Sequence, residues 1–219
     1  MSHARRQALI VRDGREGDSS ALTTNLFRPF LVRHGFEVLV EDCLEVYEDE
    51  KLLAQTDLVV QCWQAGDITP GESASLRAAV QGGTGLVGWH SGLVDAFPED
   101  FDYQLLVGGR FRLDPSGGGR HRVRLAAERA DHPVVTGLCD FDTDVERYWP
   151  LHDPLIDVLA TITFDGDDSR PGASTVPAVW TRTWGRGRVF ASTLRCRPNG
   201  TGMTHERALI ERGLLWASR

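Results

Sequence analysis

Short apolar runs alternate with segments of helical spacing along the first hundred residues. The runs are bounded by polar or turn-forming residues and cover 8–11, 36–40, 57–63 and 86–89. Between them, 22–31 carries leucine and phenylalanine at helical intervals, and Thr69-Pro70-Gly71-Glu72 is a capping box that opens a helix reaching residue 80. This alternation predicts right-handed βαβ units around a parallel sheet.

The second half is richer in short strands. Strands are expected at 120–126, 145–149 and 158–164, and the runs 176–183 and 188–194 flank a glycine-rich turn typical of a β-hairpin. Thr204 can cap a terminal helix with one apolar face. We therefore expect one domain over residues 1–219, an α/β fold in which a mostly parallel sheet is extended by antiparallel strands and covered by helices on both faces.

Composition narrows the function classes. The chain has 219 residues, enough for one well-buried domain, and its net charge of −7 argues against binding nucleic acid or an acidic membrane surface. No apolar stretch approaches the ~20 residues of a membrane span, and the N-terminus has no secretory pattern. The four scattered cysteines suit a reducing compartment, so we expect a cytoplasmic protein.

The run 86–89 ends in the turn Gly88-Trp89-His90-Ser91-Gly92, with a helix expected over 93–97. Flanking glycines let the backbone turn sharply and bring one side chain to the rim of a sheet. Hydrolases and amidotransferases place a serine or cysteine nucleophile there, whereas this chain has His90. Ser91 is out of register, because Trp89 and Leu93 stand where the glycines would be. The motif therefore argues against glutamine hydrolysis.

Ligands of such sheets bind beyond the carboxyl ends of the strands. We expect five residues there: Asp13, Trp63, Gln64, His90 and Ser91. His90 is a candidate catalytic residue, and the other four are candidate substrate-binding residues. An imidazole titrates near neutrality and can serve as a hydrogen-bond donor, a general acid or base, or a metal ligand. The alternative is a structural histidine that closes the loop.

A second polar cluster lies on the expected strand 145–149. Strand alternation places Glu146 and Tyr148 on one face, with His152 further along. Glu146 is the candidate catalytic partner of His90, and Tyr148 and His152 are candidate substrate-binding residues. Arg110, after two glycines, can clamp a pair of hydroxyls or a carboxylate. Ordinary surface charges and salt bridges are the alternative for this group.

No cofactor is indicated with certainty. A divalent metal such as zinc is left open, because a metal site needs three or more nearby ligands. The histidines available as ligands are His121, His132, His152 and His205. No two of them have the spacing of ligands on one helix or in one short loop.

Several blocks in order along the chain resemble the ThuA-like (trehalose utilisation) family of the class I glutamine amidotransferase-like superfamily. They are 82–91, Gly108-Gly109-Arg110-Phe111, 131–138, 144–148, 177–193 and 212–217. The chain departs from the family pattern at Asp114-Pro115 and at Leu194-Arg195-Cys196. The resemblance implies a three-layer, flavodoxin-like or class I glutamine amidotransferase-like fold without the nucleophile.

It also implies a role in carbohydrate metabolism, on trehalose or related glucosides and keto-sugars. The leading hypothesis is an enzyme that binds such a small-molecule carbohydrate over the strand ends and uses His90 with Glu146 for proton transfer. The alternative is a non-catalytic sugar- or partner-binding protein on a retired amidotransferase scaffold. A homo-oligomer is left open.

Overall fold

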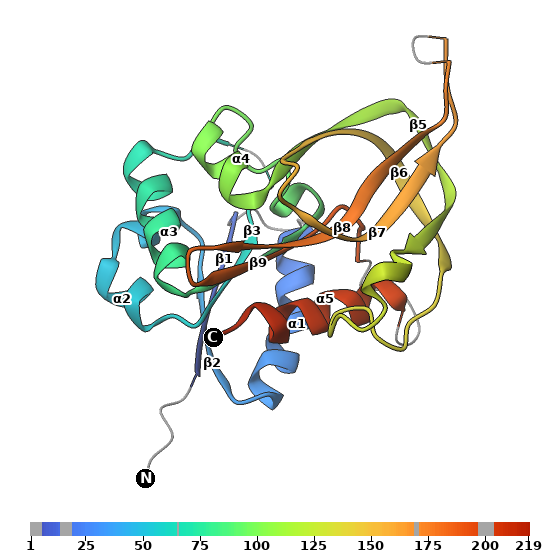
Figure 1. Cartoon of the computed structure of the whole chain (residues 1–219). Coiled ribbons are helices and arrows are strands. Elements are labelled where there is room, and N and C mark those ends of the chain that lie inside the picture. The colour runs from blue at the N-terminus through green and yellow to red at the C-terminus, as the bar shows by residue number, and fades with distance from the viewer. Residues whose placement is uncertain (1–5, 14–18, 65, 169–170, 197–203) are drawn as a thin grey trace.

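One mixed sheet organises the chain (Figure 1). The computed structural model describes residues 6–13, 19–64, 66–168, 171–196 and 204–219. Its strands pair in the order β2-β1-β3-β4-β9-β8-β7-β5-β6. Their bounds are β1 Arg6–Arg12, β2 Phe36–Glu41, β3 Leu58–Cys62, β4 Gly85–Trp89, β5 Gly109–Leu125, β6 Phe141–His152, β7 Asp157–Phe164, β8 Ser174–Trp184 and β9 Gly187–Ser192.

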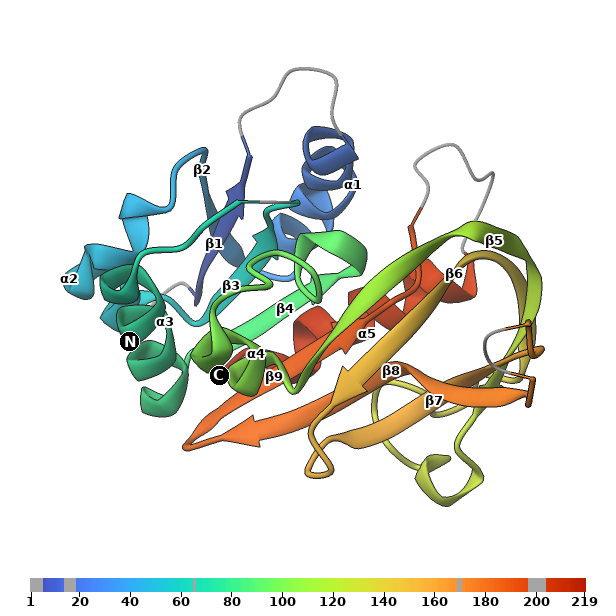
Figure 2. The same ribbon diagram turned by 90° about the horizontal axis from the view of Figure 1, so that it is seen from above.

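The half of the sheet from β2 to β9 is parallel. Every residue of β3 and β4 is buried, as expected for strands covered on both faces. Figure 2 shows α1 and α5 on one side of these strands and α2 and α3 on the other. The helices are α1 Ser19–Arg33, α2 Glu50–Gln55, α3 Pro70–Gly82, α4 Phe101–Val107 and α5 His205–Ala217.

Local signals in the sequence set several element boundaries. The capping box of α3 is confirmed: the Thr69 side chain accepts from the Glu72 N–H, and the Glu72 carboxylate accepts from the Thr69 N–H. Thr204 caps α5 as expected. The β8–β9 hairpin is also confirmed, with Trp184 paired to Gly187 and Gly185 at φ 59° in the turn. In each case neighbouring residues satisfy the backbone groups involved.

The expected extension of a parallel sheet by antiparallel strands is confirmed, but the sheet is not mostly parallel. Within the described residues, four strand pairings are parallel and four are antiparallel. The short strands expected at 120–126 and 145–149 are parts of the much longer β5 and β6, which pair with each other along their length. Hydrogen bonds between paired strands stabilise extended backbone even where the apolar alternation is weak. The hydrophobic pattern of the sequence does not reveal these hydrogen bonds.

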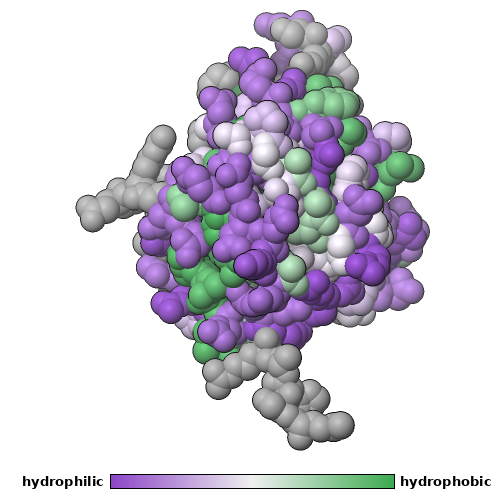
Figure 3. All heavy atoms as spheres, turned by 90° about the vertical axis from the view of Figure 1, so that its left-hand side faces the viewer, coloured by the Kyte–Doolittle hydropathy of each residue, from purple (hydrophilic) through white to green (hydrophobic). Residues whose placement is uncertain are grey.

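The apolar side chains are concentrated inside. Large side chains from both halves of the sheet are fully buried, including Trp180, Tyr103, Phe97 and Phe190. Figure 3 shows one outer face, on which hydrophilic residues predominate and hydrophobic residues form small patches. In the described part of the chain, no helix combines the length and the apolar character needed to cross a membrane.

Candidate functional site

His90 stands at the carboxyl end of β4 in a strained backbone conformation. It begins a single-turn 3-10 helix, His90–Gly92, in place of the helix expected over 93–97. Its φ of 52° makes it the one non-glycine residue with positive φ in the described part of the chain. Such strain persists only where the surroundings impose it, and it is concentrated at functional sites.

The two flanking glycines are required by close packing. A Cβ on Gly88 would lie 2.6 Å from the Leu93 Cβ and 2.7 Å from the carbonyl oxygen of Gln61. A Cβ on Gly92 would lie 3.2 Å from the Cα of Cys62. The turn after β4 therefore folds back over the end of β3, and this packing turns His90 toward the antiparallel half of the sheet.

The His90 side chain meets Glu146 of β6. The His90 Nε2 and the Glu146 Oε2 are 2.9 Å apart. Arg195, just beyond β9, donates from NH2 to the same Glu146 oxygen at 2.8 Å. The Glu146 carboxylate is thus shared by an imidazole and a guanidinium. The three groups come from three distant segments of the chain.

These three side chains line a cavity of about 260 Å³. The other lining residues are Gly118, Gly119, Asp144, Val145 and Thr193. Glu146 and Arg195 are each nearly half exposed, whereas only 12% of the His90 side chain is exposed. The imidazole therefore forms the inner wall of the cavity, and the two charged groups lie nearer its mouth.

Ser91 fixes the second nitrogen of the imidazole. Its Oγ lies 3.1 Å from the His90 Nδ1. An ionised carboxylate only accepts hydrogen bonds, so Nε2 carries the hydrogen that points to Glu146. Nδ1 of a neutral ring is then an acceptor, and the Ser91 hydroxyl donates to it. The three side chains form a continuous Ser91–His90–Glu146 hydrogen-bond chain.

The surroundings keep His90 neutral. Burial lowers the pKa of His90 first, the positive charge of Arg195 lowers it further, and Glu146 opposes both, which leaves the pKa at about 4. Burial disfavours the imidazolium because a charged ring loses its hydration. At neutral pH the ring therefore enters any reaction as a proton acceptor.

Tyr148 lies beneath this site. Its side chain is buried, its hydroxyl donates to the Pro177 carbonyl oxygen at 2.8 Å, and it accepts from the Thr193 Oγ1 at 2.8 Å. Burial raises the pKa of Tyr148 far above its ordinary value. Thr193 lines the cavity, so Tyr148 supports the cavity wall and does not itself line the cavity.

Asp13, Trp63 and Gln64 lie at the ends of β1 and β3, as expected, but they do not line the His90 cavity. Asp13 is buried, and its charge helps to raise the pKa of the buried Cys62 thiol. The Trp63 indole packs partly against the core. The strand-end rule placed these residues at the correct edge of the sheet, but His90 turns away from them toward β6 and β9.

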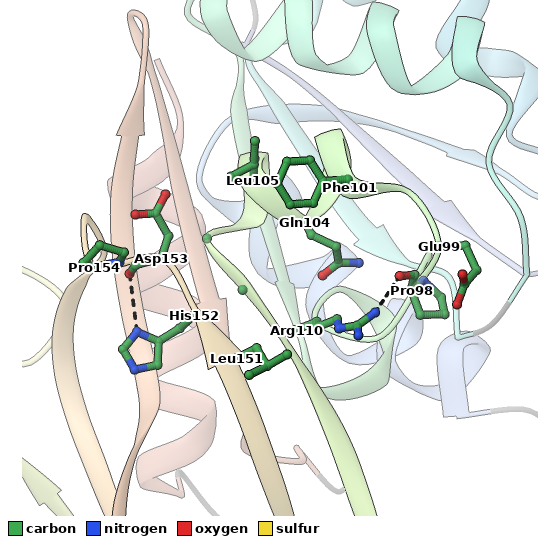
Figure 4. Close-up of a pocket in the computed structure, with 12 residues that line it drawn as sticks. Pro98, Glu99, Phe101, Gln104, Leu105, Arg110, Leu151, His152, Asp153 and Pro154 are labelled. Atoms are coloured by element: carbon green, nitrogen blue, oxygen red, sulfur yellow. Dashed lines mark hydrogen bonds between the residues drawn. The ribbon is translucent and has the colours of Figure 1, made fainter.

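Arg110 and His152 lie in a different cavity, of about 650 Å³ (Figure 4). His152 lies six positions after Glu146 on β6, which is about 20 Å of strand. Arg110 donates to the Pro98 carbonyl oxygen at 2.9 Å. The cluster expected from Glu146, Tyr148 and His152 is therefore divided between two places.

Sequence reasoning missed Arg195 and Thr193. Both follow β9, which pairs with β4 in parallel on the side away from β3. The strand-end rule that selected His90 would also have selected them, had β9 been recognised as a parallel neighbour. For a metal, the described residues include no group of three or more His, Cys, Asp or Glu side chains able to hold an ion.

Comparisons with known proteins agree with one another and cover nearly the whole chain. The family model for trehalose utilisation, ThuA, matches residues 7–217. A ThuA-like protein from Bacteroides uniformis has a TM-score of 0.76 at 16% identity, covering 99% of this chain and 93% of its own. One from Parabacteroides merdae has a TM-score of 0.68 at 18% identity, with 98% and 90% covered. A cytoplasmic protein from Salmonella typhimurium has a TM-score of 0.62 at 15% identity, and the match covers 97% of this chain and 99% of that protein. No curated protein sequence matches the chain.

Proposed function

The chain belongs to the ThuA (trehalose utilisation) family, and from that premise we propose that it acts in carbohydrate metabolism. Its substrate would be trehalose or a related glucoside or keto-sugar, bound in the cavity that His90, Glu146 and Arg195 line. The observation that carries this proposal is the hydrogen bond from a neutral, strained His90 to Glu146 at the wall of that cavity.

The His90–Glu146 pair gives the proton an acceptor at the cavity wall, and it would take up the proton of a sugar hydroxyl bound there. On the imidazole, that proton is stabilised by the negative charge of Glu146. Ser91 does not line the cavity, and its hydroxyl orients the ring through Nδ1. Arg195 holds Glu146 in place and supplies donors for a sugar oxygen at the mouth of the cavity.

The two buried cysteines support the absence of glutamine amidotransferase activity. Such an activity requires a thiolate nucleophile. Burial raises the pKa of Cys62 to about 12 and that of Cys196 to about 11, so both thiols stay protonated. His90 occupies the turn in which the nucleophile would stand.

A second candidate is a non-catalytic sugar- or partner-binding protein on an amidotransferase-like scaffold. The observation that favours this candidate is the His90 pKa of about 4, which makes the imidazole a weak base in the ligand-free protein. A general base works best with a pKa near the operating pH. On the enzymatic reading, a ligand that draws Arg195 away from Glu146 would raise the pKa of His90 and activate it.

Trehalose, glucosides and 3-keto-glucosides, each with and without added divalent metal, test the two candidates. Product formation is followed by NMR and thermal stabilisation by calorimetry. The enzyme hypothesis expects turnover that His90→Asn and Glu146→Gln abolish and that the exposed control His34→Asn leaves unchanged. Stabilisation without product supports the binding protein, since a ligand of the native state raises its apparent stability. Full turnover in His90→Asn would exclude the catalytic role.

The proposal also covers the fold type, the cellular location and the class of partner. The strand order β2-β1-β3-β4 followed by β9 supports a three-layer, flavodoxin-like core of the glutamine amidotransferase type. We also propose a cytoplasmic location, supported by the Salmonella neighbour described as cytoplasmic. The proposed partner is a small-molecule carbohydrate, and the net charge of −7 argues against nucleic acid.

A further inference from the structure

The cavity that holds Arg110 and His152 is separate from the His90 site. It lies between α4, the start of β5 and the end of β6, and its volume is about 650 Å³. No residue lines both cavities. A cavity of this size falls within the range of small-molecule sites.

An unsatisfied acceptor lies on its wall. Gln104 is 9% exposed, and its Nε2 donates to the Phe97 carbonyl oxygen at 2.8 Å. Its Oε1 is buried and has no hydrogen-bond partner among the described residues. Figure 4 shows the Gln104 amide between the Phe101 ring and the Arg110 guanidinium. Buried acceptors are normally paired, so this oxygen has the capacity to accept a hydrogen bond from a donor that a ligand brings.

The rim of the cavity is apolar and exposed. Phe101 is 73% exposed and Leu151 is 67% exposed, although both are large hydrophobic side chains that line the cavity. Leu155, next to the lining residue Pro154, is 78% exposed. Aromatic and aliphatic side chains at a cavity mouth offer area that a ligand can cover.

The charged groups balance one another. Arg110 shares the cavity wall with Glu99, and Asp153 is paired with Arg182 at 3.2 Å. The cavity therefore favours a neutral ligand over a strongly anionic or cationic one. The arrangement is apolar at the mouth and has hydrogen-bonding groups on one wall.

We propose that this cavity binds a neutral glycoside with an apolar aglycone. A sugar hydroxyl donates to the Gln104 Oε1, and Arg110 donates to neighbouring sugar oxygens. The aglycone covers Phe101 and Leu151. This site is independent of the proposed function, because its residues take no part in the His90–Glu146 contact.

Isothermal titration calorimetry with 4-nitrophenyl β-D-glucopyranoside tests the site. We expect measurable binding to the wild type that weakens about tenfold in Phe101→Ala, a change at an exposed position that leaves the fold intact. Gln104→Met, which removes the unsatisfied oxygen together with the donor to the Phe97 carbonyl oxygen, should weaken it to a similar extent, and thermal unfolding of the variant checks that the fold is kept. Val32→Ala, at an exposed hydrophobic residue of α1, is the matched control and should bind as the wild type does.

Several outcomes would overturn the proposal. One is no binding to the wild type, and another is equal binding to Phe101→Ala and Gln104→Met. Loss of binding in His90→Asn alone would move the glycoside to the other cavity. Sedimentation velocity adds a further test: a wild-type dimer that Phe101→Ala converts to a monomer would show that a second copy of the chain, and not a glycoside, covers this rim.

Discussion

His90 and Glu146 are 56 residues apart in the chain, yet the His90 Nε2 and the Glu146 Oε2 lie 2.9 Å apart. One residue follows an interior parallel strand, and the other lies within the antiparallel strand at one edge of the sheet. The strands β9, β8, β7 and β5 separate β4 from β6 in the order of pairing. The curvature of the antiparallel half, visible in Figure 1, brings β6 back over the end of β9.

Removing Arg195 should raise the pKa of His90. In Arg195→Met the imidazolium no longer faces a nearby positive charge, while Glu146 remains to stabilise it. An NMR titration of the His90 ring protons should show an upward shift of the midpoint from about 4 in the wild type. Arg33→Met, at the exposed end of α1, serves as the control. An unchanged midpoint in Arg195→Met would contradict the electrostatic account.

His90 should make the wild type lose stability on mild acidification. Its pKa is lowered in the folded protein from 6.5 to about 4, so the unfolded chain binds the proton first as pH falls. This contribution is fully present above pH 6.5 and is lost as the pH falls toward about 4. At about 1.4 kcal/mol per pKa unit it amounts to at most about 3.5 kcal/mol.

The measurement is urea unfolding of the wild type and His90→Asn at pH 7 and pH 4.5. Asparagine tolerates positive φ better than most residues, so the backbone of the turn is kept. The wild type should lose more free energy of unfolding between the two pH values than the variant does. Equal losses would show that His90 titrates alike in the folded and unfolded chains.

Gly88→Ala should be strongly destabilising. The new Cβ would overlap the Leu93 Cβ and the Gln61 carbonyl oxygen, one of which is backbone that cannot rotate away. Overpacking of this kind costs about 1–3 kcal/mol or more. Gly82→Ala is the matched control, because a Cβ there meets nothing within 4 Å at the end of α3. Thermal unfolding of both variants should show a large loss for Gly88→Ala and little or none for Gly82→Ala.

Tyr148→Phe should lower stability without removing a group from the cavity. The change deletes the donor to the Pro177 carbonyl oxygen and the acceptor for the Thr193 hydroxyl. Leaving buried polar groups unpaired costs about 1–3 kcal/mol. The Thr193 hydroxyl keeps its second partner, the Ala178 carbonyl oxygen, so a value near the lower end is expected. Urea denaturation measures the loss, and ligand affinity at the His90 cavity should stay within about twofold of the wild type, a difference of about 0.4 kcal/mol.

Much of the fold could be predicted because its signals are local. The strands of the parallel half, the capping box of α3 and the β8–β9 hairpin depend on residues close together in sequence. The extent of β5 and β6 could not, because their pairing joins residues far apart and includes an irregularity between Leu113 and Gly118. A shift in register reassigns side chains to faces, so strand alternation alone does not place β6.

By itself the sequence determined that a histidine occupies the glycine-flanked turn after β4, since this depends only on the order of residues. The sequence also made Glu146 a candidate partner of that histidine, but the contact between the two side chains and the addition of Arg195 were decided by tertiary structure. So was the division of Arg110 and His152 into a second cavity. The physical reason is that hydrophobic periodicity specifies which face of a strand is buried, whereas the order and curvature of paired strands decide which ends meet.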